Sequence, residues 1–165
     1  MTTFRRDGRQ VVAKFERQEI QVLRQCVTEM ATLLGEQPDR DDPAVERLFP
    51  DVYPEDPIEA AEFRRFTEAD LKAAKLDQAR VVLDSLVPGG GEVRLDEATA
   101  DQWMRALTDV RLVLGTRLGV EDDTDIEAEL DAAVGKNPSS PRVDQLSVYA
   151  YLGYLLESLV GAVVM

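Results

Sequence analysis

The sequence contains no histidine and a single cysteine among its 165 residues. Without histidine, the chain cannot supply a Ser-His-Asp or Cys-His catalytic set or a histidine-containing zinc site. One cysteine excludes an intrachain disulfide, a CxxC redox pair and a thiolate metal cage. We therefore expect no catalytic residues, no metal and no cofactor. The opening residues MTTFRRDGRQ lack the apolar stretch of a signal peptide, which predicts a cytoplasmic protein.

Two patterns that resemble ligand-binding loops lack the residues that such loops need. Gly89-Gly90-Gly91 is followed by Glu92, whereas a phosphate-binding loop continues with Lys and Ser or Thr. The acidic run at 123–131 has Ala128 and Val134 where a calcium-binding loop needs Gly and Glu. We interpret the glycines as turn residues and the acids as the exposed start of a helix.

Basic charge is scarce, with 19 Lys and Arg against 32 Asp and Glu and a net charge of −13. Such a chain repels phosphate backbones, so we expect no direct nucleic-acid binding by the chain alone. One local basic cluster lies near the N-terminus, and we interpret it as the solvated face of a small hairpin. Its members are Arg5, Arg6, Arg9, Lys14 and Arg17.

A hydrophobic content of 44% is enough to form a core. The segment patterns predict a single domain over 1–165 that is mainly α (α+β), a helical bundle-like domain with a small antiparallel β-sheet. Asp7-Gly8 lies between two short runs and predicts a β-hairpin over 1–15, with strands near 3–6 and 9–15. A short strand over 92–95 is expected to join this hairpin.

The remaining segments are predicted from apolar spacing and capping signals. A first helix is predicted over 16–35. It is followed by an acidic, proline-rich loop over 36–57, which contains at most one short helix, over 42–49. The remainder, 58–165, is helical. There, Asp56-Pro57 opens one helix, and Thr67 with Asp70 resembles a capping box that opens a second. Further helices are expected over 97–118, 124–134 and 142–163.

The last helix is apolar enough to raise the question of a membrane span, because Glu157 is the only charged residue in 146–164. Glu157 lies near the middle and no Lys or Arg flanks the C-terminal side, so we expect no membrane insertion. Instead, the helix is predicted to be buried against the 97–118 helix or across a dimer interface. The candidate interface residues are Leu146, Tyr149, Gly153, Leu156 and Val160.

Cys26 is the one residue with distinctive reactivity. It lies beside the apolar face formed by Leu23, Val27 and Met30, and this position predicts a partly buried, inert small hydrophobe. The alternative is a redox-sensitive thiol, whose pKa Arg24 could lower if both side chains were exposed.

Five stretches carry a family resemblance, namely FRRDGR, VVAKFE, EFRRFTEADLKAAK, RALTDVRLVLGTRLGV and YAYLGYLLESLV. They resemble one actinobacterial family, catalogued as a domain of unknown function, that includes the oxidative stress regulator AosR, and the likeness covers nearly the whole chain. The resemblance implies a cytoplasmic transcriptional regulator that binds a stress-responsive sigma factor. It also implies a disulfide switch between two cysteines a few residues apart, which Cys26 alone cannot form.

Three functions remain open. The leading hypothesis is a regulatory protein that acts by protein–protein interaction, as an oxidative-stress-linked transcriptional regulator that binds a sigma factor. The acidic surface suits this, because sigma factors carry basic DNA-binding surfaces. The alternative is a homodimeric helical scaffold or adaptor without redox function. An enzyme ranks lowest, because no histidine or recognisable cofactor loop is present.

Overall fold

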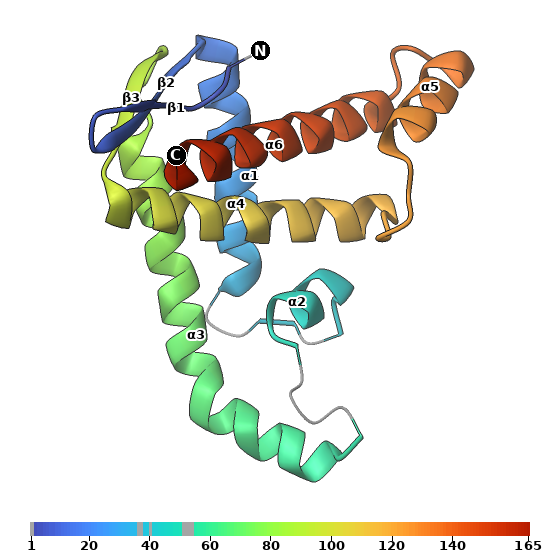
Figure 1. The fold of residues 1–165 in the computed structure, drawn as a ribbon. Coiled ribbons are helices and arrows are strands. Elements are labelled where there is room, and N and C mark those ends of the chain that lie inside the picture. Colours follow the sequence, from blue (N-terminus) through green and yellow to red (C-terminus); the bar gives the residue numbers. More distant parts are fainter. Residues whose placement is uncertain (1, 36–37, 40, 51–54) are drawn as a thin grey trace.

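The computed structural model describes residues 2–35, 38–39, 41–50 and 55–165. In chain order, the described elements are β1 (Arg5–Asp7), β2 (Gln10–Phe15), α1 (Arg17–Leu34), α2 (Pro43–Leu48), α3 (Pro57–Ser85), β3 (Gly91–Leu95), α4 (Glu97–Leu118), α5 (Ile126–Lys136) and α6 (Pro141–Val164). Figure 1 shows the small sheet at one end of a group of helices, with the N- and C-termini near that end. The prediction of a mainly α fold with a small antiparallel sheet is confirmed.

The three strands pair in the order β1-β2-β3, with both pairs antiparallel. Asp7 pairs with Gln10 across the hairpin turn, and Gly8 adopts a φ of 64° there, a conformation that glycine takes without a Cβ penalty. This register places the first strand at 5–7, slightly later than predicted from the sequence. Ala13 of β2 pairs with Val93 of β3, so the third strand joins the hairpin as predicted.

Helix α1 begins with a reciprocal cap. The Glu19 carboxylate accepts a hydrogen bond from the Glu16 backbone N–H at 2.7 Å, and the Glu16 side chain caps the first turn in return. One face of the helix is buried over its whole length, as its apolar spacing predicts. Its members are Ile20, Leu23, Val27, Met30 and Leu34.

Helix α2 forms at the short helical signal inside the acidic segment. Asp42 accepts a hydrogen bond from the Ala44 N–H at 2.9 Å and Pro43 occupies the first turn, a position where proline loses no helical hydrogen bond. The Arg117 guanidinium at the end of α4 donates to both Asp42 carboxylate oxygens at 2.8 Å. This charged hydrogen bond holds the pKa of Asp42 below its usual value.

Helix α3 corrects the expectation of two helices between 57 and 86. It runs without a break from Pro57 to Ser85. The Thr67 hydroxyl, expected at a helix start, instead donates to the Phe63 carbonyl at 2.8 Å inside the helix. Threonine is tolerated there because it bonds the carbonyl four residues earlier. No Gly or Pro between 58 and 85 interrupts the helix, so the capping pattern at Thr67 and Asp70 is a false start signal.

Helices α4 and α6 lie side by side and run in opposite directions (Figure 1). Asp96 caps α4 by accepting from the Thr99 N–H at 2.8 Å, and Gly119 ends it in the left-handed conformation. The structure therefore places α6 against the 97–118 helix, the first of its two predicted positions. Helix α5, at 126–136 rather than the predicted 124–134, begins after Asp125, which accepts from the Ala128 N–H at 3.1 Å.

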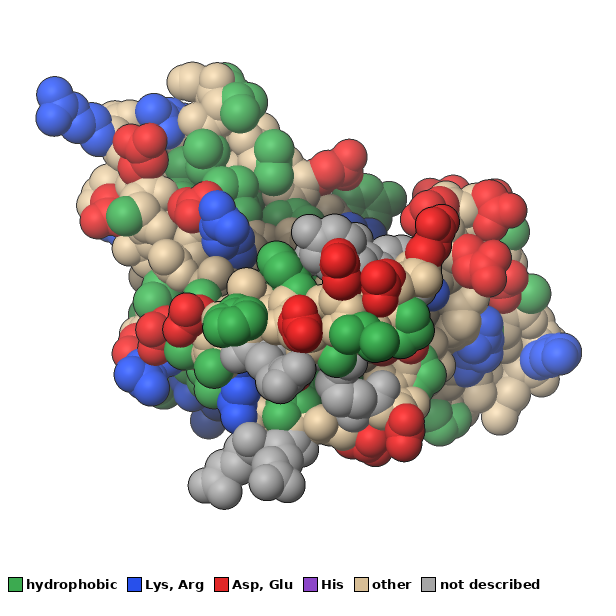
Figure 2. All heavy atoms as spheres, turned by 90° about the horizontal axis from the view of Figure 1, so that it is seen from below, with side chains coloured by type: hydrophobic (Ala, Val, Ile, Leu, Met, Phe, Trp, Pro, Cys, Tyr) green, Lys and Arg blue, Asp and Glu red, His purple; other side chains and the backbone are tan. Residues whose placement is uncertain are grey.

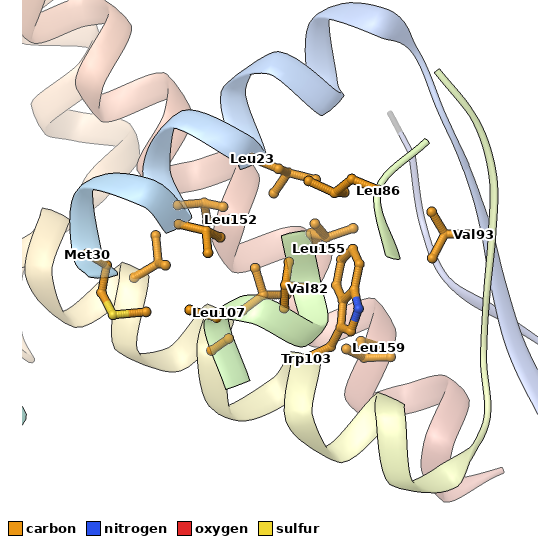
Figure 3. Packing of buried hydrophobic residues seen from close by; sticks show 14 of the residues in the cluster. Leu23, Met30, Val82, Leu86, Val93, Trp103, Leu107, Leu152, Leu155 and Leu159 are labelled. Atoms are coloured by element: carbon orange, nitrogen blue, oxygen red, sulfur yellow. The ribbon is translucent and has the colours of Figure 1, made fainter. Parts of the chain in front are cut away.

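The core is centred on Trp103 of α4, which is fully buried. The Phe4 ring meets it edge-on with centroids 5.6 Å apart, and the Phe15 ring stacks on it at 6.1 Å. Figure 3 shows the indole beside Leu155 and Leu159 of α6, so helix and sheet residues share one interior. The sheet is thereby joined to α4 and α6 by apolar packing.

Within the described ranges, α6 is the one helix whose length and composition suit a membrane span. Core helices of globular proteins meet the same criterion. In this structure, α6 places Leu152, Leu155 and Leu159 in the main core, with none of their surface exposed.

Candidate functional site

Cys26 lies at a groove between α1 and α4. The groove has a volume of about 360 Å³, and its apolar walls include Cys26 and Met30 from α1 and Val110 and Leu114 from α4. The other lining residues are Thr28, Glu29, Thr32, Leu33, Val113 and Arg117. Cys26 is of intermediate burial, so the prediction that its helical position leaves it at least partly buried is confirmed.

The surroundings of Cys26 make its thiol a weak nucleophile. Burial raises its pKa from 9.0 to about 11, and the negative charge of Glu29 adds to this shift. The thiolate is the reactive form, so at neutral pH the side chain is almost entirely the unreactive thiol. Arg117 also lines the groove, but its guanidinium is held by Asp42. The groove can hold an apolar group and offers no activated nucleophile.

The five α6 residues predicted as an interface share one helix face, but the structure uses much of that face inside the chain. Leu146 is fully buried in a small apolar cluster with Leu118 and Ala133. Leu156 packs partly buried against the main core, and Val160 is 43% exposed. Leu146 therefore has no surface to offer a partner, and Val160 is the most exposed of the five.

The other two of these residues, Tyr149 and Gly153, contact Arg111 of α4. The Arg111 guanidinium lies 4.9 Å from the centroid of the Tyr149 ring, a cation–π contact. A Cβ at Gly153 would lie 3.3 Å from the same guanidinium, so the glycine gives Arg111 room. This contact joins α4 to α6 and was not expected from the sequence, since nothing local indicates which residue α6 presents to Arg111.

Exposed apolar residues on α3 were not predicted from the sequence. Ile58 is 73% exposed and Phe66 is 83% exposed. Neither belongs to the core, to which α3 contributes Ala79 and Val82. The signal available in the sequence is that apolar residues of α3 do not share a single stripe, which is typical of a helix with more than one contact surface.

No group of three or more Cys, Asp or Glu side chains in the described part of the chain is arranged to hold a metal ion. The basic cluster on the hairpin is exposed, as expected, and Arg94 reaches the same surface to form an ion pair with Asp7 at 3.0 Å. Neither feature forms a reactive centre. Two surfaces that the structure offers to a ligand or partner are the Cys26 groove and the exposed apolar residues of α3.

Nearly the whole chain matches one known family. Residues 1–163 match the family described as "Domain of unknown function (DUF2017)", and the chain belongs to it. No solved structure matches the chain.

The curated relatives carry names that point to a regulatory role. A Mycobacterium leprae protein, provisionally named oxidative stress regulator AosR, is 33% identical over 135 residues, covering 74% of this chain and 58% of that protein. The oxidative stress regulator AosR of Mycobacterium bovis is 32% identical over 92 residues, covering 48% of this chain and 42% of that protein. The Mycobacterium tuberculosis protein of the same name has the same identity and coverage. The chain spans about half the length of the curated relatives it matches.

Proposed function

We propose that this chain is a cytoplasmic, non-enzymatic regulator of the oxidative stress response that acts by binding another protein, a sigma factor. The observation that carries the proposal is the family match over residues 1–163, with relatives named oxidative stress regulators. The surface supports it, because a net charge of −13 favours a partner with a basic surface. The exposed apolar residues of α3 offer an area that a partner could cover.

In this proposal, binding does not depend on oxidation of Cys26. A disulfide within these 165 residues is impossible with one cysteine. The raised pKa of Cys26 also disfavours attack on peroxide or on another disulfide, because both reactions need the thiolate. Cys26 then serves to complete the packing of α1 beside the groove.

The test is a direct titration of a purified stress-responsive sigma factor from the source organism into this chain, by isothermal calorimetry. We expect a stable complex under reducing conditions and after mild peroxide treatment. The matched variant Cys26→Ser should bind equally well in both. Absence of a complex refutes the sigma factor as partner. Binding that appears only after oxidation and is lost in Cys26→Ser contradicts the redox-independent mechanism.

A further inference from the structure

The N-terminal half of α3 projects beyond the bundle formed by α1, α4 and α6 (Figure 1). Residues at steps of three and four along this half form one side of the helix, which we call the outward face of α3. Every side chain that the structure describes on this face is exposed. Its members are Ile58, Glu59, Glu62, Phe66, Ala69, Asp70 and Ala73.

The apolar part of the outward face is too exposed to serve the chain's own core. Ile58 and Phe66 lie two helical turns apart and are 73% and 83% exposed, while Ala69 and Ala73 continue the same stripe with small side chains. Covering an exposed phenylalanine with the apolar surface of a partner lowers the free energy of the complex, because apolar area is removed from water. Glu62 lies between the two large side chains, and the small alanines follow Phe66, where the backbone of an approaching helix can come close.

The charged side chains that the structure describes on the outward face are all acidic. Glu59, Glu62 and Asp70 lie beside the apolar stripe, and none of the described side chains of this face is basic. Figure 2, which views the molecule from the end where α3 begins, shows acidic and hydrophobic side chains next to one another at that end. The occupant that complements such a face has apolar residues flanked by Lys and Arg.

The same charges argue against two other occupants. Two copies of the chain, each with a net charge of −13, would bring their Glu59, Glu62 and Asp70 carboxylates together if they packed through this face, which is unfavourable. A membrane surface rich in anionic lipids is repelled in the same way. A basic protein segment is left as the occupant that the surface favours.

We propose that the outward face of α3 is the docking surface for a helical segment of another protein that carries apolar residues at steps of three and four and basic residues beside them. This inference rests on the proposed function in one respect, namely that the chain acts by binding a protein. It adds where the partner binds and what its contacting segment consists of. The partner segment lies along α3, with its apolar residues on Phe66 and Ile58 and its cations at Glu62 and its acidic neighbours.

The first test is site-specific photo-crosslinking with the full chain expressed in its native host. Phe66 is replaced by the photoreactive phenylalanine analogue p-benzoylphenylalanine. The matched control carries the analogue at Tyr154, an aromatic residue on α6 that is 49% exposed. We expect Phe66 crosslinks to map to a segment with a net positive charge and apolar three- and four-residue spacing, at a yield about tenfold above the control. Crosslinks to a second copy or to an acidic segment, or a yield no higher than at Tyr154, overturn the inference.

The outcome for the proposed function is separate. A basic amphipathic segment from a protein other than a sigma factor supports this docking surface and refutes the proposed partner. A sigma factor that binds the chain but crosslinks only at positions outside the outward face of α3 supports the proposed partner and refutes this docking surface.

The second test measures affinity for the captured segment, synthesised as a peptide. Phe66→Ala should weaken binding about tenfold or more, as for a central aromatic contact. Glu62→Gln should weaken it less and make it less sensitive to salt. Val134→Ala, at a 41% exposed position on α5, is the matched control and should change nothing. Circular dichroism confirms that each variant is folded. Equal affinity of wild type and folded Phe66→Ala overturns the inference.

Discussion

At the scale of single residues, burial determines the reactivity of the Cys26 thiol. Its pKa of about 11 leaves roughly 100-fold less thiolate at pH 7.5 than a thiol with a pKa of 9.0. We therefore expect alkylation of the folded chain by iodoacetamide to be slower than that of the denatured chain by at least that factor. The rate is followed by intact mass. Equal rates in the folded and denatured chain would show that the groove does not protect the sulfur.

The raised pKa of Cys26 also predicts how the stability of the chain changes at high pH. The folded state holds the Cys26 proton more tightly than an unfolded chain with a pKa near 9.0, so this contribution to the free energy of unfolding is complete below pH 9. It is lost as the pH rises towards 11. The stability of Cys26→Ser, measured by urea unfolding between pH 8 and 11, should fall less steeply than that of the wild type. Parallel profiles contradict the assignment.

A second residue-scale feature is the buried ion pair that joins α3 to α4. Lys75 Nζ donates to both Asp109 carboxylate oxygens at 2.9 and 3.0 Å, and the two side chains are only 13% and 10% exposed. Asp109→Ala leaves the ammonium buried without its partner, so we expect a loss of about 3–5 kcal/mol in the free energy of unfolding. Urea titration measures it.

The control for this pair is the exposed ion pair between Arg105 and Asp101, whose side chains are 62% and 50% exposed. Asp101→Ala should cost about 1 kcal/mol or less. The double variant Lys75→Met/Asp109→Leu should recover much of the stability lost in Asp109→Ala, because it removes both charges at once. Similar small losses in the two single variants would contradict the burial of the Asp109 pair.

At the scale of the elements, α6 is held by leucines that point into the main core. Leu155 is fully buried, whereas Val160 on the same helix is 43% exposed. Leu155→Ala should lower the free energy of unfolding by about 2–5 kcal/mol through lost burial and a residual cavity. Val160→Ala should change it by about 0.5 kcal/mol. Comparable losses in the two variants would mean that the buried side of α6 is assigned wrongly.

The elements also show why some of the fold could be predicted and some could not. The hairpin and α4 carry local signals that admit one interpretation, namely Asp7-Gly8 at the turn and Asp96 with Gly119 at the helix ends. Helix α3 contains a capping signal at Thr67 but does not start there, because the Thr67 hydroxyl donates a hydrogen bond to the Phe63 carbonyl inside the helix. Capping residues predict a boundary only where the chain must also turn, and tertiary packing decides that.

The candidate site could be predicted only in part for the same reason. The partial burial of Cys26 follows from its place beside the apolar face of α1, which is a local property. The opposite wall of its groove comes from Val110 and Leu114, more than 80 residues further along. The exposure of Phe66 likewise depends on how far α3 extends past the neighbouring helices. The spacing of apolar residues in the sequence does not predict that distance.

At the scale of the whole molecule, charge decides which macromolecules can approach. The basic side chains of the hairpin are exposed, but the molecule carries a net charge of −13. Arg94 and Asp7 already neutralise each other at 3.0 Å on this surface. The local attraction for phosphate is therefore opposed by the field of the remainder.

We expect from this balance that the chain alone has no sequence-specific affinity for duplex DNA. Contacts made only by surface arginines are nonspecific and weaken steeply as salt displaces them. In a band-shift titration, any binding seen at 50 mM salt should disappear at 200 mM and should not prefer one sequence. Arg6→Ala combined with Arg9→Ala is the control, since both are exposed on the hairpin and the pair should remove such residual binding. A shift that persists at 200 mM salt, prefers one sequence and survives this double substitution would place a DNA-binding surface elsewhere, despite the unfavourable net charge.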